Sequence, residues 1–233
     1  METRAHTAIQ AIRPPHHPSQ DLTDAVVTTC PGATVLTLAA GAAIYRQGDV
    51  CRHAYVLIDG LVMLSRITAD GQRLALALLS RGDWLGALTG ADIGREAEET
   101  AEAKGPVQLC RVAHADLRIW LARSPDHAWD LIHRTDAQRR HLMKKLESLV
   151  TRDVRARLAE TLRELLDRFG EPCDHGFGIH VRLTQQELAD LVGASRPVVS
   201  TILNEFRDQG ILGYSRDLIC VSRLDAFQNL LAG

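Results

Sequence analysis

Residues 194–206, ASRPVVSTILNEF, decide the fold of the C-terminal part of the chain because they describe a helix with two different faces. Ser195 is a suitable N-cap, and Pro197 falls in the first turn, where its missing N–H removes no helical hydrogen bond. One face carries apolar residues at helical spacing, namely Val199, Ile202, Leu203 and Phe206. The other face carries Arg196, Pro197, Ser200, Thr201 and Asn204. The first face is predicted to pack, and the second is left free for a partner.

The neighbouring sequence places this helix in a larger motif. Thr184 and Glu187 fit a capping box that starts a helix at about residues 185–192, Gly193 supplies the turn, and Gly210 ends the second helix. Residues 211–221, ILGYSRDLICV, then predict two short strands around Ser215-Arg216-Asp217. A helix at 153–169 and a glycine-rich loop at 170–178 come before. The pattern predicts a winged helix-turn-helix.

The polar face of the predicted second helix suits contact with DNA. A recognition helix places its first residues against base edges in the major groove, and an arginine there binds guanine O6 and N7. The predicted DNA-contacting residues are Arg196, Pro197, Ser200, Thr201 and Asn204, with Thr184, Gln185 and Ser195 at the helix starts. Arg196 alone is equally consistent with a solvated helix surface. Together with the capping box, the turn and the wing, it favours DNA binding.

The N-terminal part has a different pattern. Residues 1–24 contain His6, His16 and His17 without periodicity and predict a flexible tail. From about residue 25 to 113, glycines separate short β-prone runs, which is typical of an antiparallel sandwich or barrel. Asp59-Gly60 and Asp70-Gly71 are hairpin signals, and the second joins the runs LVMLSRI and RLALALL.

A long helix is predicted at residues 124–150, with Ser124 as cap and Pro125 as its first residue. Its apolar stripe contains Trp129, Ile132, Leu142, Leu146 and Leu149. A narrow stripe of this kind either packs on its own domain or forms a two-stranded coiled coil with a second copy. Asp136 and Arg139 interrupt the stripe, and the pattern still favours the homodimer.

Composition sets the broad limits. The chain has 233 residues, 45% hydrophobic content and a net charge of -2, so any contact with nucleic acid must come from local charge placement. No apolar run of about 18 residues and no signal peptide are present, which predicts a cytoplasmic protein without membrane contact. The five cysteines are widely spaced without a C-x-x-C, so we expect mostly buried thiols, and neither a metal site nor a cofactor.

Residues 41–86, GAAIYRQGDVCRHAYVLIDGLVMLSRITADGQRLALALLSRGDWLG, resemble the cyclic-nucleotide-binding-type barrel of the CRP/FNR transcription regulators. The resemblance continues into LTQQELADLVGASRPVVSTILNEFRDQGIL, residues 183–212. It implies an α+β protein with an antiparallel jelly-roll β-barrel sensor domain at 25–123, a dimerisation helix at 124–150 and a winged helix-turn-helix domain at 151–233. It also implies a homodimer on a two-fold symmetric double-stranded DNA site, with RNA polymerase as a further partner.

The same resemblance locates an effector pocket that lacks the contacts to cyclic AMP. Ala87, Ala97 and Glu98 stand where the family's cyclic-AMP-binding members carry a glutamate, an arginine and a serine after Gly86. Leu142 and Met143 stand where those members contact adenine through a threonine and a serine. Arg95 can replace the missing arginine only if the loop shifts by two residues. We therefore expect no response to cyclic AMP, and the effector stays open.

Other sensing modes of the family also lack their ligands here. Cys30 is the single cysteine before the barrel, which is too few for an iron–sulfur cluster. Leu85 and Ala87 replace the haem ligands of the carbon-monoxide sensor. Haem bound through another histidine and a redox response of an exposed cysteine remain open.

The resemblance also shows differences among the predicted DNA-contacting residues. Pro197 stands where the cyclic-AMP-binding members carry a glutamate that accepts a hydrogen bond from cytosine, and Thr201 stands where they carry an arginine. The sequence therefore predicts a guanine contact from Arg196 and a changed preference at the neighbouring base pair. The segment 169–180, FGEPCDHGFGIH, lies where activating members touch RNA polymerase, but it matches no contact pattern.

An enzyme is disfavoured because no P-loop, G-x-S-x-G or H-E-x-x-H motif is present. A protein-interaction module without DNA contact is the remaining alternative.

Overall fold

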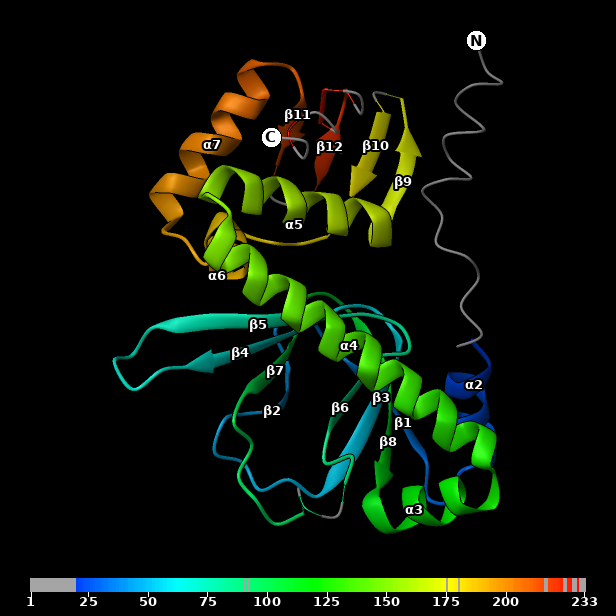
Figure 1. The fold of residues 1–233 in the computed structure, drawn as a ribbon. Helices are drawn as coiled ribbons and strands as arrows, with labels where there is room; N and C mark the ends of the chain where they lie inside the picture. Colours follow the sequence, from blue (N-terminus) through cyan, green and yellow to red (C-terminus); the bar gives the residue numbers. More distant parts are fainter. Residues whose placement is uncertain are drawn as a thin grey trace. The chain divides into compact units, whose positions relative to one another are not determined.

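The computed structural model describes residues 20–89, 91, 93–174, 176–179, 181–215, 218–223, 226, 227 and 230. These residues form two compact units, which divide between Glu147 and Ser148. His6, His16 and His17, together with Arg216 and Asp217 of the predicted wing turn, lie outside the described residues. Figure 1 shows the two units.

The N-terminal unit contains two antiparallel sheets with the strand orders β1-β8-β3-β6 and β2-β7-β4-β5. Its strands are β1 (Thr34–Leu38), β2 (Ala43–Tyr45), β3 (His53–Asp59), β4 (Val62–Ile67), β5 (Arg73–Leu79), β6 (Trp84–Gly86), β7 (Thr100–Ala103) and β8 (Val107–Ala113). The runs are short because glycine-containing turns interrupt them, as the spacing of the glycines predicts. The predicted antiparallel jelly-roll is confirmed, as two open sheets that do not close into a barrel.

The core of this unit has two layers. Between the two sheets lies an apolar cluster from both, which includes Leu57, Val62, Leu79, Ala101 and Leu109. The outer face of the first sheet is covered by two helices, α2 (Gln20–Thr29) and α3 (His114–Arg123), through a second cluster that contains Val26, Val56, Trp84, Leu117 and Trp120. Burial of these side chains on both faces fixes the register of the first sheet.

The two helices α2 and α3 correct the sequence-based expectations. Residues 20–24 were expected in the flexible tail, but they form the start of α2, where Leu22 is buried. Residues 114–123 were expected within the β domain, but they form α3, and its Trp120 donates a hydrogen bond to Thr29 of α2 over 2.8 Å. Both helices are stabilised mainly by packing on the sheet. The apolar periodicity of their own sequences indicates them only weakly.

The two Asp-Gly pairs differ in their outcome. Asp70-Gly71 joins β4 and β5, which pair with each other, so this hairpin is confirmed. The hairpin predicted at Asp59-Gly60 is wrong, because β3 pairs with β6 and β8, and β4 pairs with β5 and β7. Gly60 lies where the chain passes from one sheet to the other, and a Cβ there would stand 2.4 Å from the carbonyl oxygen of Pro106.

The long helix α4 (Pro125–Thr151) agrees closely with the range predicted from the sequence. Its side chains reach back to the N-terminal unit at polar positions. Lys145 Nζ donates to the carbonyl oxygen of Ala75 over 2.8 Å, and Gln138 Nε2 donates to that of Trp84 over 3.2 Å. Residues 124–147 of this helix segment are therefore tied to the sheets by backbone carbonyls, while its apolar stripe is left for other contacts.

The C-terminal unit contains helices α5 (Val154–Phe169), α6 (Gln185–Val192) and α7 (Arg196–Asp208) and one antiparallel sheet of order β11-β12-β10-β9. Its strands are β9 (Gly170–Cys173), β10 (Gly176–Ile179), β11 (Leu212–Tyr214) and β12 (Ile219–Val221). The predicted wing strands 211–221 are present as β11 and β12. The segment 170–178, predicted as a loop, instead forms the hairpin of β9 and β10, because β10 finds a partner in β12 that is distant in sequence.

The cysteines are less buried than the sequence suggests. Cys30 and Cys110 are buried, as expected, but Cys173 is exposed and Cys51 and Cys220 are half-buried. The expectation of mostly buried thiols is therefore wrong for three of the five. Exposure of Cys173 follows from its place at the end of an edge strand, which the sequence analysis assigned to a loop.

Candidate nucleic-acid interface and effector pocket

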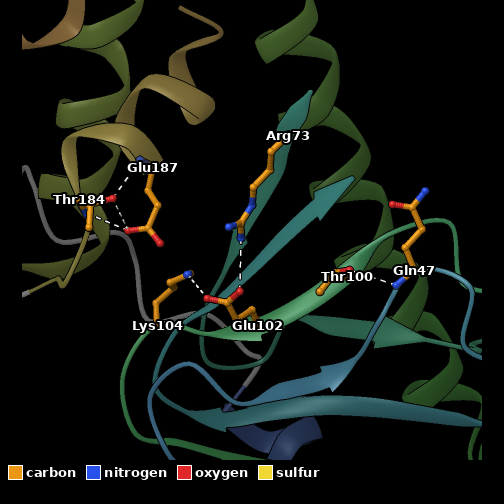
Figure 2. A network of polar contacts seen from close by, with 7 residues as sticks. All are labelled: Gln47, Arg73, Thr100, Glu102, Lys104, Thr184 and Glu187. Carbon is orange, nitrogen blue, oxygen red and sulfur yellow. Dashed lines mark hydrogen bonds and ion pairs between the residues drawn. The ribbon is translucent and has the colours of Figure 1, made fainter. Parts of the chain in front are cut away.

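Helix α6 begins with a complete capping box, which is drawn in Figure 2. Glu187 N donates to Thr184 Oγ1 over 3.2 Å, and Thr184 N donates to Glu187 Oε2 over 2.8 Å. Two backbone N–H groups that lack helical partners are satisfied in this way. The cap fixes the position at which the first helix of the motif begins.

The turn between the two helices depends on a glycine and on an arginine from a third helix. Gly193 has φ 68° and ψ 48°, the left-handed conformation that ends many helices. Arg157 of α5 donates through Nε to the carbonyl oxygen of Val192 over 2.9 Å and through Nη2 to that of Gly193 over 3.1 Å. A cation at a helix C-terminus also interacts favourably with the helix dipole. Sequence reasoning did not identify Arg157, because no spacing links it to residue 193.

Helix α7 packs through the apolar face that the sequence predicts. Val199, Ile202, Leu203 and Phe206 are all buried. Arg155 of α5 pairs with Glu205, and its guanidinium lies 5.0 Å from the centre of the Phe206 ring. These contacts fix the rotation of α7 about its axis, and so they decide which residues face solvent.

The opposite face of α7 is exposed at Arg196, Pro197, Thr201 and Asn204, and half-buried at Ser200. Arg196 makes no hydrogen bond or ion pair with the residues that the structure describes, so its guanidinium is available to a ligand. Thr201 Oγ1 donates to the carbonyl oxygen of Pro197 over 3.0 Å, so this hydroxyl is already engaged within the helix. The start of α7 therefore presents one cation, small polar groups and an apolar spot.

The wing is attached to the start of α6 through Tyr214. This residue ends β11, and its hydroxyl donates to the carbonyl oxygen of Leu183 over 2.8 Å. Burial raises the pKa of Tyr214, so the phenol stays protonated and able to donate. This hydrogen bond connects the wing, which follows α7 in the sequence, to the residue before Thr184, which precedes α6 and α7.

The residues predicted to line an effector pocket include Gly86, at the end of β6 in the N-terminal unit, and Ala87. Ala87 is fully buried, and its N–H donates to the carbonyl oxygen of His53 over 2.9 Å. A Cβ at Gly86 would stand 3.0 Å from the ring of Tyr55, so this aromatic side chain lies directly over the glycine. The place where the family's glutamate would project carries only the methyl group of Ala87.

The following segment puts its charged residues outside. Ala97 is 6% exposed and is held by a hydrogen bond from its N–H to the carbonyl oxygen of Asp49 over 2.8 Å. Arg95 and Glu98 are exposed. Glu98 Oε2 lies 3.2 Å from Nη1 of Arg66, in a solvated ion pair. Neither charged side chain lies in the interior near Gly86.

Two further glutamates of residues 95–102, REAEETAE, have partners of their own. Figure 2 shows Glu102 between Arg73 of β5, at 3.4 Å, and Lys104. Glu99 Oε1 accepts a hydrogen bond from the hydroxyl of Tyr45 over 2.8 Å. Three of the acidic side chains in this run, Glu98, Glu99 and Glu102, are therefore engaged by residues of the same unit.

Tyr45 and Tyr55 form an aromatic pair that the sequence analysis missed. Their ring centres are 6.1 Å apart, and the ring of His53 is 6.3 Å from that of Tyr55. Burial, together with the neighbouring carboxylate of Glu99, strongly raises the pKa of Tyr45, so its phenol donates to Glu99 at any ordinary pH. Side chains of the protein itself thus occupy the surroundings of Gly86.

The apolar stripe of α4 is uncovered in the single chain. Trp129, Ile132, Leu142, Met143, Leu146 and Leu149 are all exposed, Trp129 to 60% and Leu146 to 56%. None of the residues of this helix, all of which the structure describes, is fully buried. Exposed apolar side chains gathered on one element are typical of an interaction surface.

Comparisons with known proteins identify both units. A family model of the cyclic nucleotide-binding domain matches residues 35–124, and one of the Crp-like helix-turn-helix domain matches residues 156–230. A CRP-like cAMP-activated global transcriptional regulator from Mycobacterium tuberculosis is 29% identical over 170 residues, 73% of this chain and 75% of the relative. The chain belongs to the CRP/FNR family of transcription regulators.

Two other proteins match this CRP/FNR regulator over a larger share of its length. A global nitrogen regulator from Synechococcus elongatus is 29% identical over 183 residues, 78% of this chain and 82% of the relative. The structure of FixK2 from Bradyrhizobium japonicum has a TM-score of 0.74 at 22% identity and covers 86% of this chain and 98% of that one. The second likeness shows the shared fold. No helix among the described residues of this CRP/FNR regulator is long and apolar enough to cross a membrane.

The predicted site residues of this CRP/FNR regulator fall into three groups. Thr184, Gln185, Ser195 and the polar residues of α7 belong to the matched helix-turn-helix domain. Gly86, Ala87, Arg95, Ala97 and Glu98 belong to the matched cyclic nucleotide-binding domain. Leu142 and Met143 lie on α4, outside both matched ranges. The sequence did not indicate Arg157, Tyr45 and Glu99, whose roles depend on contacts between distant segments.

Proposed function

We propose that this CRP/FNR regulator is a homodimer that reads a two-fold symmetric double-stranded DNA site with the start of α7 and that it acts without cyclic AMP. The proposal rests above all on Arg196, an exposed guanidinium without a partner among the described residues, at the first position of a helix whose other face is buried. In the major groove such a side chain binds guanine bidentately. As a DNA-binding regulator, it is proposed to act in the cytoplasm.

The neighbouring residues define the expected base preference. Pro197 has no side-chain hydrogen-bonding group, and the Thr201 hydroxyl is already bonded to the Pro197 carbonyl oxygen. Both therefore offer apolar surface, which suits the methyl group of thymine. Ser200 and Asn204 can bond bases or phosphates, while Thr184, Gln185 and Ser195 lie at helix starts, where backbone N–H groups bind phosphate. We expect a guanine next to a position that tolerates or prefers thymine.

Independence from cyclic AMP is supported by the surroundings of Gly86. A cyclic nucleotide carries a negative charge and needs a cation in its pocket. Here the buried positions after Gly86 carry Ala87 and Ala97, the cation Arg95 is exposed, and Tyr45 with its carboxylate partner Glu99 lies among the pocket's aromatic residues. The relative from Mycobacterium tuberculosis is named as cAMP-activated, so this chain is proposed to differ from it in its signal.

The remaining parts of the proposal follow from the family. The exposed stripe Trp129, Ile132, Leu142, Leu146 and Leu149 is proposed to join two copies along α4. RNA polymerase is proposed as a partner on the target promoter. The chain is proposed to regulate rather than to catalyse, and no cofactor is needed for that role.

Selection from random DNA, with and without cyclic AMP, tests the proposal. We expect recovery of a palindrome that contains a guanine in each half-site and whose affinity is unchanged by cyclic AMP. DNA binding that appears only with cyclic AMP would contradict the proposal that the protein acts without the nucleotide. It would not contradict the proposed contact of α7 with DNA. Absence of any salt-sensitive DNA binding would instead favour a protein-interaction module, because phosphate contacts weaken steeply as salt rises.

A substitution separates base reading from general charge attraction. Arg196→Ala is expected to weaken binding to the selected site by about 1–3 kcal/mol and binding to random DNA by less. Arg207→Ala is the control, because it removes another exposed cation, one that lies 3.6 Å from Asp208 in the last turn of the same helix. Arg207→Ala should weaken binding to the selected site and binding to random DNA to the same small extent. Equal losses from the two variants on both DNAs would contradict base reading by Arg196.

A further inference from the structure

Two cysteines that lie 47 residues apart in the sequence meet on the sheet of the C-terminal unit. The Sγ atoms of Cys173 and Cys220 are 3.7 Å apart. Cys173 is the last residue of β9 and Cys220 is the central residue of β12. The two strands are not neighbours, because β10 lies between them in the strand order (Figure 1).

The register of the sheet explains how the two side chains reach each other. Cys173 stands opposite Gly176, and Cys220 stands opposite Gly178, so all four positions lie on one face of the sheet. Both residues of β10 on this face are glycines, and no side chain separates the thiols. Gly176 is required there, since a Cβ would stand 2.3 Å from the carbonyl oxygen of Val221. The glycines leave a bare strip across which the sulfur atoms face each other.

A direct disulfide fits this arrangement poorly. Neighbouring strands are about 4.8 Å apart, so two strands that flank a third are separated by roughly 9–10 Å. A disulfide needs Cα atoms within about 4.4–6.8 Å. Strands β9 and β12 would have to close over β10, and their hydrogen bonds to β10 oppose that movement. An atom that bridges the two sulfurs needs no such movement.

We propose that Cys173 and Cys220 form a dithiolate site for a soft divalent cation of the zinc and cadmium class. In tetrahedral coordination with metal–sulfur bonds of about 2.3 Å, two thiolates stand about 3.8 Å apart. The separation of 3.7 Å between the two Sγ atoms is close to this value. Thiolate sulfur is also the ligand that soft cations select over the harder oxygen ligands.

Binding at this site is an exchange of protons for the ion. Thiolate ligation requires that both Cys173 and Cys220 lose the proton of the thiol. Each of the two thiols releases one proton to solvent as one divalent ion binds, and no electron is transferred. The exposed position of Cys173 gives the ion a path from solvent.

The site is open to exchange. No group of three or more His, Cys, Asp or Glu side chains able to hold a metal ion is found within the part of the chain that the structure describes. As far as the described residues go, the two thiolates are the protein ligands, and the other two coordination positions are left to water or to a small thiol from solution. Structural sites hold the ion with four protein ligands, whereas two thiolates hold it with half as many protein bonds. The site is therefore suited to reversible occupation.

Cadmium titration of the reduced full-length chain tests the proposal. The readouts are the near-ultraviolet absorption of the cadmium–thiolate bond and the number of thiols that still react with a chromogenic disulfide reagent. We expect one cadmium ion per chain and the loss of two reactive thiols. Cys173→Ser and Cys220→Ser should each weaken cadmium binding at least about a hundredfold, because the remaining thiol binds without its tethered neighbour.

Cys51→Ser is the matched control, since it removes a half-buried cysteine from the other unit. Cadmium affinity and the loss of two thiols should be unchanged in this variant. Cys173 is exposed, so its substitution should leave the far-ultraviolet circular dichroism unaltered. The Cys173→Ser variant therefore tests the proposed site even if Cys220→Ser misfolds. Cadmium binding of equal strength in the wild-type chain and in Cys173→Ser would overturn the proposal.

Discussion

Tyr45 shows at the level of one residue why the surroundings of Gly86 differ from an open nucleotide site. Its hydroxyl donates to Glu99 over 2.8 Å, and its ring lies 6.1 Å from that of Tyr55. A hydrogen bond to a carboxylate in a half-buried place stabilises both partners. The phenol and the carboxylate satisfy each other, so neither group needs a ligand as its hydrogen-bond partner.

Removal of this hydrogen bond gives the first prediction. Tyr45→Phe should lower the free energy of unfolding of the N-terminal unit by about 1–2 kcal/mol, because Glu99 loses a charge-assisted partner. Urea unfolding followed by circular dichroism measures the change. Tyr55→Phe is the control, since its hydroxyl makes no hydrogen bond with the described residues, and it should change stability by much less. Equal effects of the two substitutions would contradict a stabilising role of the pair.

Residues whose role is local were predictable from the sequence, and those with distant partners were not. The burial of Val199 and the exposure of Arg196 follow from helical periodicity alone. Arg157 contacts the turn after α6 across 35 or more residues, and Tyr45 meets Glu99 across 54. An isolated arginine or tyrosine carries no spacing signal, so only the fold reveals these partners.

Helix α6 is the element whose start depends most clearly on one side chain. Thr184 both caps the helix and takes part in the reciprocal bond with Glu187. Thr184→Ala should lower the free energy of unfolding of the C-terminal unit by about 1 kcal/mol, because an N–H at the helix start loses its acceptor. Thermal unfolding measures the loss. Thr184→Ser keeps the hydroxyl and should retain most of the stability, and an equal loss in both variants would show that the methyl group matters instead.

Elements were predicted well where a local signal starts and ends them. The Pro125 start of α4, the Thr184 cap of α6 and the strands of the wing were all predicted close to their observed bounds. The hairpin of β9 and β10 was missed because glycines read as loop, and pairing with β12 supplies the stabilisation that local propensity lacks. The Asp59-Gly60 turn was misread because a tight turn between sheets and a hairpin use the same residue types.

At the scale of the whole molecule, α4 is the element that would bring two copies of α7 together in the proposed dimer. Within its stripe, Ile132 and Leu146 are fourteen residues apart and Leu142 and Leu149 are seven apart, which is the repeat of a two-stranded coiled coil. Their exposure in the single chain is therefore explained if a second copy covers them. A dimer joins two copies of α7, and linked contacts bind a palindrome far more tightly than one contact does.

Disruption of the stripe gives the last prediction. The double substitution Leu142→Glu and Leu146→Glu places like charges along the seam and should convert the dimer to a monomer in sedimentation equilibrium. Binding to the palindrome should fall by at least about a hundredfold, because the second half-site contact is lost. Binding to an isolated half-site should stay nearly unchanged, since α7 itself is intact.

The control for this double variant is Ile119→Glu, which adds a charge at an exposed apolar residue of α3, away from the stripe. It should leave both the sedimentation behaviour and the affinity for the palindrome unaltered. A double variant that stays dimeric would show that the stripe is not the interface. A monomer that binds the palindrome as tightly as the wild-type chain would show that the two copies of α7 do not act together, and the exposed stripe would then need another occupant.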